Sequence, residues 1–197
     1  MYRKFFVIIL LIELLFLTGC LNFKAKDDPT RFYMLSSVVM EQRCTKVGRT
    51  VGVARVVIPD YLDRAKIVTE VRENEFNVGE FHCWAESIDR GITRVMVENL
   101  SSRLCNFSVL PAPWRGLAKP DLELHVHILE FKSQLHKCET LLVARYYITN
   151  VSDGKNVCSN EVCVTVPFVD CGDYYLDVVA SMNEALAGLS REIADKL

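Results

Sequence analysis

The chain has 197 residues, half of them hydrophobic, and a formal net charge of −2. This hydrophobic content excludes an intrinsically disordered protein. The lack of any cluster of lysines and arginines in the sequence argues against nucleic acid as a partner. The length is enough for one domain with its own core, but not comfortably for two.

The first twenty residues have the layout of a bacterial export signal. Arg3 and Lys4 precede an almost unbroken apolar run over residues 5–16, and small residues stand directly before Cys20. The run is too short to span a bilayer. The segment Leu17-Thr18-Gly19-Cys20 resembles the lipobox of bacterial lipoproteins, in which the cysteine is acylated and becomes the first residue of the mature protein.

This resemblance divides the chain into three parts. We expect residues 1–19 to be a signal peptide, and residues 20–29 to be a polar tether whose Cys20 carries fatty acyl chains such as palmitate. Residues 30–197 would form a single domain. Leu21 implies sorting to the outer membrane, because a retention signal would usually place aspartate there. The alternative is an ordinary buried helix that ends in a free cysteine.

The first half of the domain is predicted to contain four strands followed by a helix. The strands are indicated by β-branched and aromatic residues without helical spacing. They are residues 31–38, 50–58, 67–71 and 76–81. The second is apolar on both faces, which places it inside a sheet, and the last two flank Glu73-Asn74-Glu75 as a hairpin. Apolar residues then recur at three- and four-residue steps from Trp84 to Leu104, which predicts a helix.

The second half of the domain is predicted to be mainly β, with a helix at its end. A short strand at residues 107–110 stops at Pro111-Ala112-Pro113. Residues 122–129 alternate between apolar and more polar side chains, as a half-buried strand does. The β pattern continues at residues 141–149 and 162–168, joined by a turn signal. Apolar spacing from Val179 to Ile193 predicts the C-terminal helix, with Asp173 as a candidate N-cap.

These elements predict an α+β fold. The simplest arrangement is a two-layer domain in which a mixed or mostly antiparallel sheet carries two main helices packed on one face.

The sequence contains little that indicates catalysis. His125 and His127 project from the same side of one predicted strand beside Glu123, and two imidazoles with a carboxylate could ligate zinc. A solvated sheet face explains the same residues without a metal, and we favour it. No recognisable nucleophile, metalloprotease or phosphate-loop motif is present. We therefore predict no enzymatic activity, no catalytic residues, no metal and no cofactor.

The cysteines leave two interpretations open. Seven of the eight cysteines follow Cys20, and none has the CxxC spacing of redox or zinc sites. They are either small buried hydrophobic residues or members of one to three disulfides. Because seven is odd, we expect at least one free thiol in each mature chain unless two chains are cross-linked.

Two segments suggest a function beyond the core. The segment from Ile58 to Arg64 leaves a strand through a proline and then places Tyr61 between acidic residues and Arg64. Tyr61 or Leu62 could fill the core, or Tyr61 and Arg64 could form a partner surface, because aromatic residues and arginine are enriched at interfaces. Trp84, which opens Trp84-Ala85-Glu86, is the third partner-contact candidate.

Together these segments make a resemblance to a known family. The matching pieces run in order along the chain and are residues 31–35, 51–53, 58–64, 84–86, 98–100, 180–182, 189–190 and 193–194. The chain resembles the auxiliary lipoproteins of ABC-type transport systems, of the paraquat-inducible C type linked to MCE lipid transporters. It departs from that pattern at Cys83, Ser87 and Ile88, and in its many cysteines.

The resemblance implies a function and a place in the cell. The chain would be an accessory component of an ABC/MCE-type lipid transport system, anchored at the periplasmic face of the outer membrane in a Gram-negative envelope. Its partners would be an MCE-type periplasmic protein and the outer membrane itself, and assembly into a homo-oligomer is left open. The alternative is a free-standing periplasmic lipoprotein that binds a small ligand in its own pocket.

Overall fold

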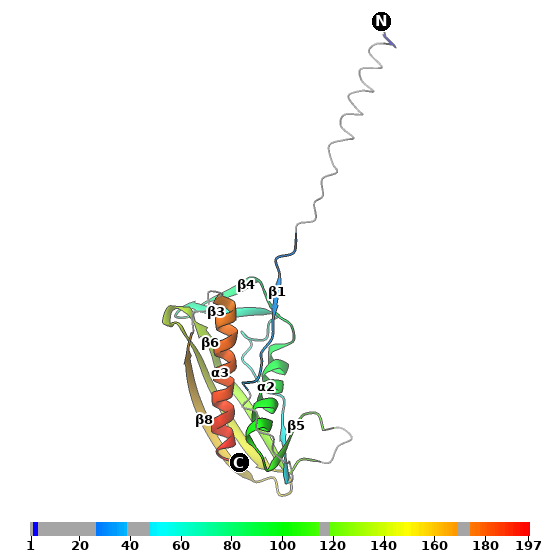
Figure 1. Ribbon diagram of the computed structural model, residues 1–197, viewed down its shortest axis with the longest axis vertical. Helices are drawn as coiled ribbons and strands as arrows, with labels where there is room; N and C mark the ends of the chain where they lie inside the picture. Colours follow the sequence, from blue (N-terminus) through cyan, green and yellow to red (C-terminus); the bar gives the residue numbers. More distant parts are fainter. Residues whose placement is uncertain (1, 4–26, 39–47, 115–118, 169–173) are drawn as a thin grey trace.

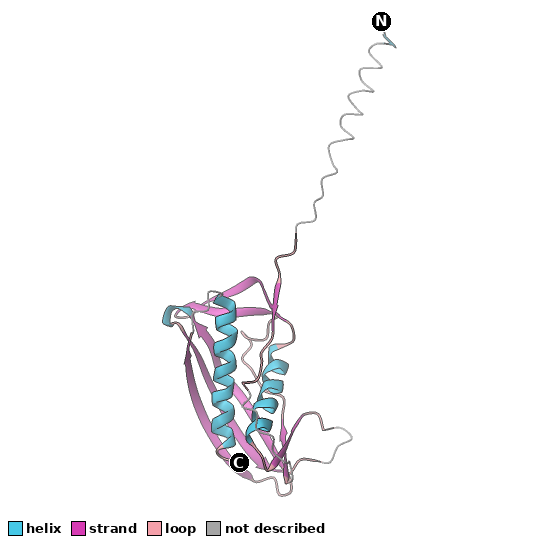
Figure 2. Ribbon diagram, in the orientation of Figure 1, coloured by secondary structure: helices cyan, strands magenta, loops and turns pink. Residues whose placement is uncertain are grey.

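The computed structural model describes residues 2–3, 27–38, 48–114, 119–168 and 174–197. Within these residues the protein is an α+β domain, as predicted: a mixed sheet forms one layer and the helices α2 (Ile88–Arg103) and α3 (Tyr174–Ala194) form the other (Figures 1 and 2). Both helices lie on the same face of the sheet (Figure 1). The signal segment, Cys20 and Asp173 lie outside the described residues, apart from Tyr2 and Arg3. No helix among the described residues has the length and hydropathy needed to cross a bilayer.

The long strand β6 (Leu122–Gln134) is the centre of the sheet. On one edge it pairs antiparallel with β7 (Glu139–Asn150), which pairs antiparallel with β8 (Asn156–Pro167), and the short 3-10 helix η1 (Leu135–Lys137) joins β6 to β7. The other edge of β6 is shared by two neighbours. Its first part pairs in parallel with β2 (Arg49–Val53), and its last residue pairs with β3 (Lys66–Arg72).

Three shorter strands complete the sheet. The strand β5 (Phe107–Pro111) pairs in parallel with β2, which confirms that β2 lies inside the sheet. The strands β3 and β4 (Glu75–Trp84) form the predicted antiparallel hairpin, with Asn74 in the left-handed region at φ 64°. The strand β1 (Arg31–Tyr33) adds to β4 in parallel. Gly52 in β2 has no side chain, which lets the ring of Trp114 lie against the strand.

The helices enclose the core because each carries one apolar stripe. In α2 (Ile88–Arg103) and α3 (Tyr174–Ala194) the residues at three- and four-residue spacing are buried against the sheet and against each other. Among them are Ile92, Met96, Leu100 and Leu186, each less than 2% exposed. Burying such a side chain stabilises the fold by roughly 1.5 to 3 kcal/mol.

The first predicted strand is shorter than expected. Residues 31–38 were predicted as one strand, but β1 ends at Tyr33. Helix side chains bind the backbone that follows: Ser36 N–H donates to Asn183 Oδ1 (2.9 Å) and Val38 N–H donates to Asn99 Oδ1 (3.2 Å). The segment is therefore held by the helices and not by a neighbouring strand.

The first helix also begins later than predicted. Trp84 is the last residue of β4, Ser87 occupies the N-cap position and α2 starts at Ile88. The backbone at the junction is bound to β1, because Ala85 N–H donates to the carbonyl of Tyr33 (2.8 Å). Trp84 thus stands four residues before Ile88, as a helical residue would, although it belongs to the strand β4.

The structure supports the disulfide interpretation for one described cysteine, but none of the free cysteines that it describes is buried: Cys83 and Cys158 are half-buried, and Cys138 and Cys163 are exposed. Cys105 is disulfide-bonded, whereas Cys83, Cys138, Cys158 and Cys163 are free. The free thiols among the described residues agree with the expectation of at least one per chain.

Candidate functional site

The two segments singled out in the sequence meet in space. Asp63, Arg64 and Ala65 from the turn after β2 and residues 84–87 from the β4–α2 junction line one shallow pocket of about 360 Å³. A backbone hydrogen bond joins the two sides, because Trp84 N–H donates to the carbonyl of Ala65 (2.7 Å). The hairpin β3–β4 positions them, since it returns the chain to the point where β3 begins.

The turn itself is tightly wound. Pro59 cannot donate to a sheet ladder, and its carbonyl accepts instead from Leu62 N–H (3.0 Å). The carbonyl of Asp60 accepts from Asp63 N–H (3.2 Å), and that of Leu62 accepts from Arg64 N–H (2.7 Å). These local bonds hold the backbone of residues 59–64 in one conformation, so its side chains are presented at fixed positions.

The inner side of the turn belongs to the core. Leu62 is only 5% exposed, and Tyr61 is half-buried with its ring against Phe76 at a centroid distance of 5.2 Å. The Tyr61 hydroxyl accepts a hydrogen bond from Phe131 N–H in β6 (2.9 Å). Burial raises the pKa of Tyr61 above its ordinary value.

That hydrogen bond fills a gap on the edge of β6. Val57 bridges to His127 beyond the end of β2, with Ile128 N–H donating to the Val57 carbonyl (2.8 Å), and β3 does not pair until Gln134. Phe131 lies between these two neighbours. A buried backbone N–H without a partner is costly, and the Tyr61 hydroxyl supplies the acceptor there.

The outer side of the turn is available to a partner. Asp60, Asp63 and Arg64 are exposed, and no described residue forms an ion pair with the Arg64 guanidinium. Trp84 is 8% exposed and forms the inner wall beside Arg64. Of the three predicted contact residues, Arg64 therefore lies outermost, and Tyr61 and Trp84 hold the surface from within.

A network around Arg94, which the sequence did not single out, joins three of the matching segments, residues 31–35, 84–86 and 98–100. Its Nη2 atom donates to Glu86 Oε1 (2.6 Å) and to the carbonyl of Leu35 (2.7 Å), and Nη1 donates to Glu98 Oε1 (3.3 Å). The hydrogen bond to Glu86 is the main reason that the pKa of Arg94 is raised. The i,i+4 spacing from Arg94 to Glu98 was the only sequence signal for it.

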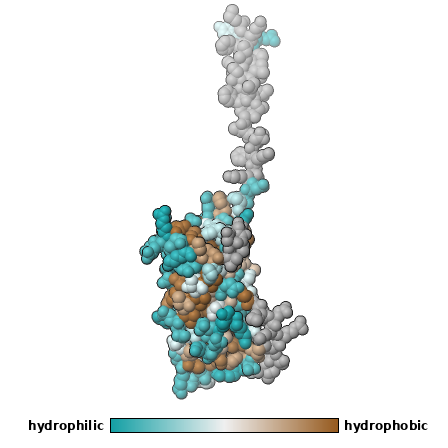
Figure 3. Space-filling model, turned by 60° about the vertical axis from the view of Figure 1, so that its left-hand side comes forward, coloured by the Kyte–Doolittle hydropathy of each residue, from teal (hydrophilic) through white to brown (hydrophobic). Residues whose placement is uncertain are grey.

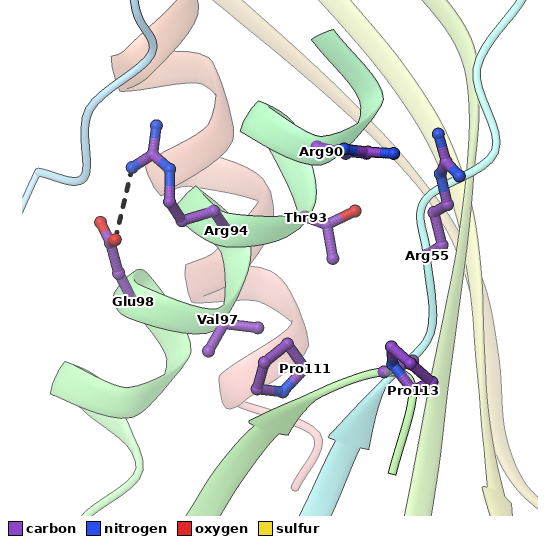
Figure 4. Close-up of a pocket in the computed structure, with 9 residues that line it drawn as sticks. Arg55, Arg90, Thr93, Arg94, Val97, Glu98, Pro111 and Pro113 are labelled. Atoms are coloured by element: carbon purple, nitrogen blue, oxygen red, sulfur yellow. Dashed lines mark hydrogen bonds and ion pairs between the residues drawn. The ribbon is translucent and has the colours of Figure 1, made fainter. Parts of the chain in front are cut away.

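A second pocket, of about 450 Å³, lies between α2 and the end of β5 (Figure 4). Its lining residues are Arg55, Arg90, Thr93, Arg94, Val97, Glu98 and residues 111–113. Arg55 forms an ion pair with the buried carboxylate of Asp89. Burial acts to raise the pKa of Asp89, but the hydrogen bonds from Arg55 and Ser87 and the charge of Arg55 together outweigh it, so the pKa lies below its ordinary value.

The two histidines on β6 have protein partners. Tyr147 from β7 hydrogen-bonds His127 Nε2 through its hydroxyl (2.8 Å) and stacks on the His125 ring at 5.2 Å. His125 Nε2 also lies 3.4 Å from Glu123 Oε2. No group of three metal-ligating side chains occurs among the residues that the structure describes.

Comparison with known proteins points to one family. Residues 33–194 match the family described as ABC-type transport auxiliary lipoprotein component, which confirms the resemblance seen in the sequence. The intermembrane transport lipoprotein PqiC of Escherichia coli K12 is 26% identical over 125 residues, which are 62% of this chain and 64% of PqiC. The match thus spans slightly less than two thirds of that relative.

Two solved structures share the fold. An uncharacterised protein has a TM-score of 0.70 at 20% identity, over 85% of this chain and 97% of its own. A Xanthomonas campestris protein of the DUF330 family has a TM-score of 0.68 at 16% identity, over 84% of this chain and 93% of its own. At these identities the likeness shows the fold alone.

Proposed function

The chain belongs to the family of ABC-type transport auxiliary lipoprotein components, and from this premise we propose that it is the outer-membrane-anchored accessory subunit of an MCE-type lipid transport system. It would stand on the periplasmic face of the outer membrane and dock a periplasmic MCE protein, so that lipid can pass between the envelope membranes. The name of the Escherichia coli relative, an intermembrane transport lipoprotein, supports this proposal. The proposal includes no enzymatic step, because the family is one of transport components.

The observation that carries the docking proposal is the surface formed by Asp63, Arg64 and residues 84–87. Two segments that are distant in sequence converge on it, and both are fixed by backbone hydrogen bonds and by buried side chains. A rigid surface loses little conformational entropy when a partner binds. Its exposed arginine, next to Asp63 in the chain, offers directional contacts to polar groups of a partner.

The shape of the domain agrees with an anchor at Cys20. The chain enters the fold at β1, and exposed large hydrophobic side chains lie on and next to β1, along the length of β4 and in the first turn of α3. They are Phe32, Met34, Phe76, Val78, Phe81, Tyr174 and Leu176. Figure 3 shows apolar surface in the upper half of the domain, and further apolar residues in its lower half.

With an anchor at Cys20, this apolar surface would lie close to the bilayer. Arg31 stands eleven residues after Cys20, so a fully extended tether reaches at most roughly 40 Å. Apolar side chains near the membrane–water interface increase the membrane affinity that the acyl chains provide. Cys20→Ala should abolish incorporation of labelled palmitate and release the protein from the outer-membrane fraction. If the wild-type protein takes up no label, the proposed anchoring is wrong.

Docking is tested by Arg64→Ala, measured as affinity for the purified MCE partner. We expect about a tenfold loss or more, corresponding to about 1.4 kcal/mol. Arg72→Ala is the matched control, because Arg72 is also an exposed arginine but lies at the tip of the β3–β4 hairpin. Unchanged affinity in a folded Arg64→Ala protein rules out this surface. Binding of lipid by the isolated protein, with no affinity for any MCE protein, would favour the free-standing alternative.

A further inference from the structure

The pocket between α2 and the end of β5 is not part of the docking surface, and its polarity is divided. Arg55 and Arg90 stand at one side of it, and Figure 4 shows the Arg90 side chain extending toward Arg55. The opposite side is formed by Val97 and by residues 111–113, Pro-Ala-Pro (Figure 4). A ligand that fits must therefore have one polar end and one apolar end.

The charges at the polar side favour an anion. Arg55 is neutralised by Asp89, whereas Arg94 is paired with two carboxylates, Glu86 and Glu98, away from the side that Arg55 and Arg90 share (Figure 4). Arg90 is exposed and has no ion pair with any residue in the described part of the chain. The side that Arg90 and Arg55 share thus keeps one uncompensated positive charge. Guanidinium groups bind phosphate and carboxylate through paired hydrogen bonds, and a bound anion also relieves the repulsion between two facing arginines.

The opposite side suits a hydrocarbon chain. Pro111 and Pro113 offer no backbone N–H, and Val97 adds a branched apolar side chain from α2. The pocket volume of about 450 Å³ lies in the lower part of the usual range for small-molecule sites, about 300 to 1,000 Å³. This is room for a head group and part of one acyl chain.

We propose that this pocket binds an anionic amphiphile, with a phosphate or carboxylate head group at Arg90 and Arg55 and an acyl segment on Val97 and residues 111–113. The inference deepens the proposed function, on which it rests only for the source of the ligand, a membrane lipid. It gives the accessory subunit its own contact with the class of molecule that the system would carry.

Calorimetric titration of the purified, lipidated protein with hexyl phosphate tests the proposal. Inorganic phosphate tests the head group alone, and hexyltrimethylammonium presents the same chain with the opposite charge. We expect hexyl phosphate to bind at least tenfold more tightly than inorganic phosphate, and the cation not to bind. Equal affinity for hexyl phosphate and inorganic phosphate would show a site for free phosphate and would overturn the proposal of an amphiphile. No binding of hexyl phosphate overturns the proposal entirely.

Variants locate the binding. Arg90→Gln should lower the affinity for hexyl phosphate at least tenfold, and Val97→Trp should block it by filling the apolar side. Arg191→Gln is the matched control, an exposed helical arginine on α3 that lies outside this pocket. Hexyl phosphate bound equally by the wild-type protein and by Arg90→Gln would show a different site. Loss of the MCE partner in Arg90→Gln, without amphiphile binding in the wild type, would assign the pocket to a protein interface. Because the titration contains no partner, its result does not depend on docking at Arg64.

Discussion

The hydrogen bond from Phe131 N–H to the Tyr61 hydroxyl leads to a quantitative prediction. Tyr61→Phe keeps the ring in its contact with Phe76 but removes the hydroxyl oxygen that accepts from this N–H. Phe131 is 1% exposed and lies where none of the described strands pairs with β6 on that edge. A buried donor left without a partner costs about 1 to 3 kcal/mol. For a chain of this size this loss lowers Tm by about 2 to 4 °C for each kcal/mol.

The measurement is the free energy of unfolding by urea, with the denaturant slope checked for constancy. Tyr147→Phe is the control, because the Tyr147 hydroxyl bonds a histidine side chain on the outer face of β6, where water can replace it. We expect the control to lose less than about 0.5 kcal/mol. Equal stability of the two variants would refute the idea that Tyr61 closes the gap on β6. If Tyr61→Phe instead weakened partner binding at unchanged stability, the hydroxyl would belong to the docking surface.

Three further predictions concern titration and thiol chemistry. Burial acts to raise the pKa of Glu70, but hydrogen bonds, the strongest of them from the Gln134 amide, lower the pKa below its ordinary value. The contribution of the Glu70 carboxylate to stability is therefore present above about pH 4.3 and is lost as the pH falls through the folded-state pKa. Glu70→Gln should flatten the fall in unfolding free energy between about pH 5 and 3, and an unchanged slope would contradict this. Burial raises the pKa of Tyr174 to about 12. Its contribution to stability is therefore lost as the pH rises from about 10, where the tyrosine ionises in the unfolded chain, through the folded-state pKa. Tyr174→Phe should remove this part of the loss of stability at alkaline pH, and the absorbance of tyrosinate follows the ionisation. In the native protein a maleimide should react first at the exposed Cys138 and Cys163, and it should not react at Cys105 before reduction. If mass spectrometry finds no labelled site in denatured, unreduced monomer, the prediction of free thiols is wrong.

Local patterns were sufficient to predict most of the elements. The alternation at residues 122–129 and the apolar run at 141–149 identified β6 and β7, because burial on one face of a sheet imposes a period of two. Helical spacing identified α2 and α3, because burial of one face of a helix imposes a period near four. Each of these signals is contained within the element that it predicts.

The errors arose where distant residues decide the structure. The end of β1 depends on Asn99 and Asn183, which bind the backbone of residues 36–38 from two helices. The start of α2 depends on Trp84 pairing with Ala65. No pattern near Arg31 or Trp84 contains this information.

The candidate site likewise combines features that the local sequence predicts with features that depend on distant residues. The segment from Pro59 to Arg64 could be recognised as unusual, but which of its side chains face inward could not be read from it. The gap on β6 that Tyr61 fills exists only after β2 and β3 have taken their places on the same edge. Arg90 and Arg55 likewise come together only when α2 packs beside the end of β5.

The position of β6 in the chain determines the order in which the domain can assemble. It supplies a partner to β2, β3 and β7, yet it consists of residues 122–134. A chain that emerges from its N-terminus first presents β2 and the β3–β4 hairpin long before this strand exists, whereas β6, β7 and β8 follow one another through short connections and pair locally. The later part of the chain is therefore the template, and the earlier part is added to it. A truncated product that ended before residue 122 would contain the β2–β5 pair and the β3–β4 hairpin segment but not the strand that joins them.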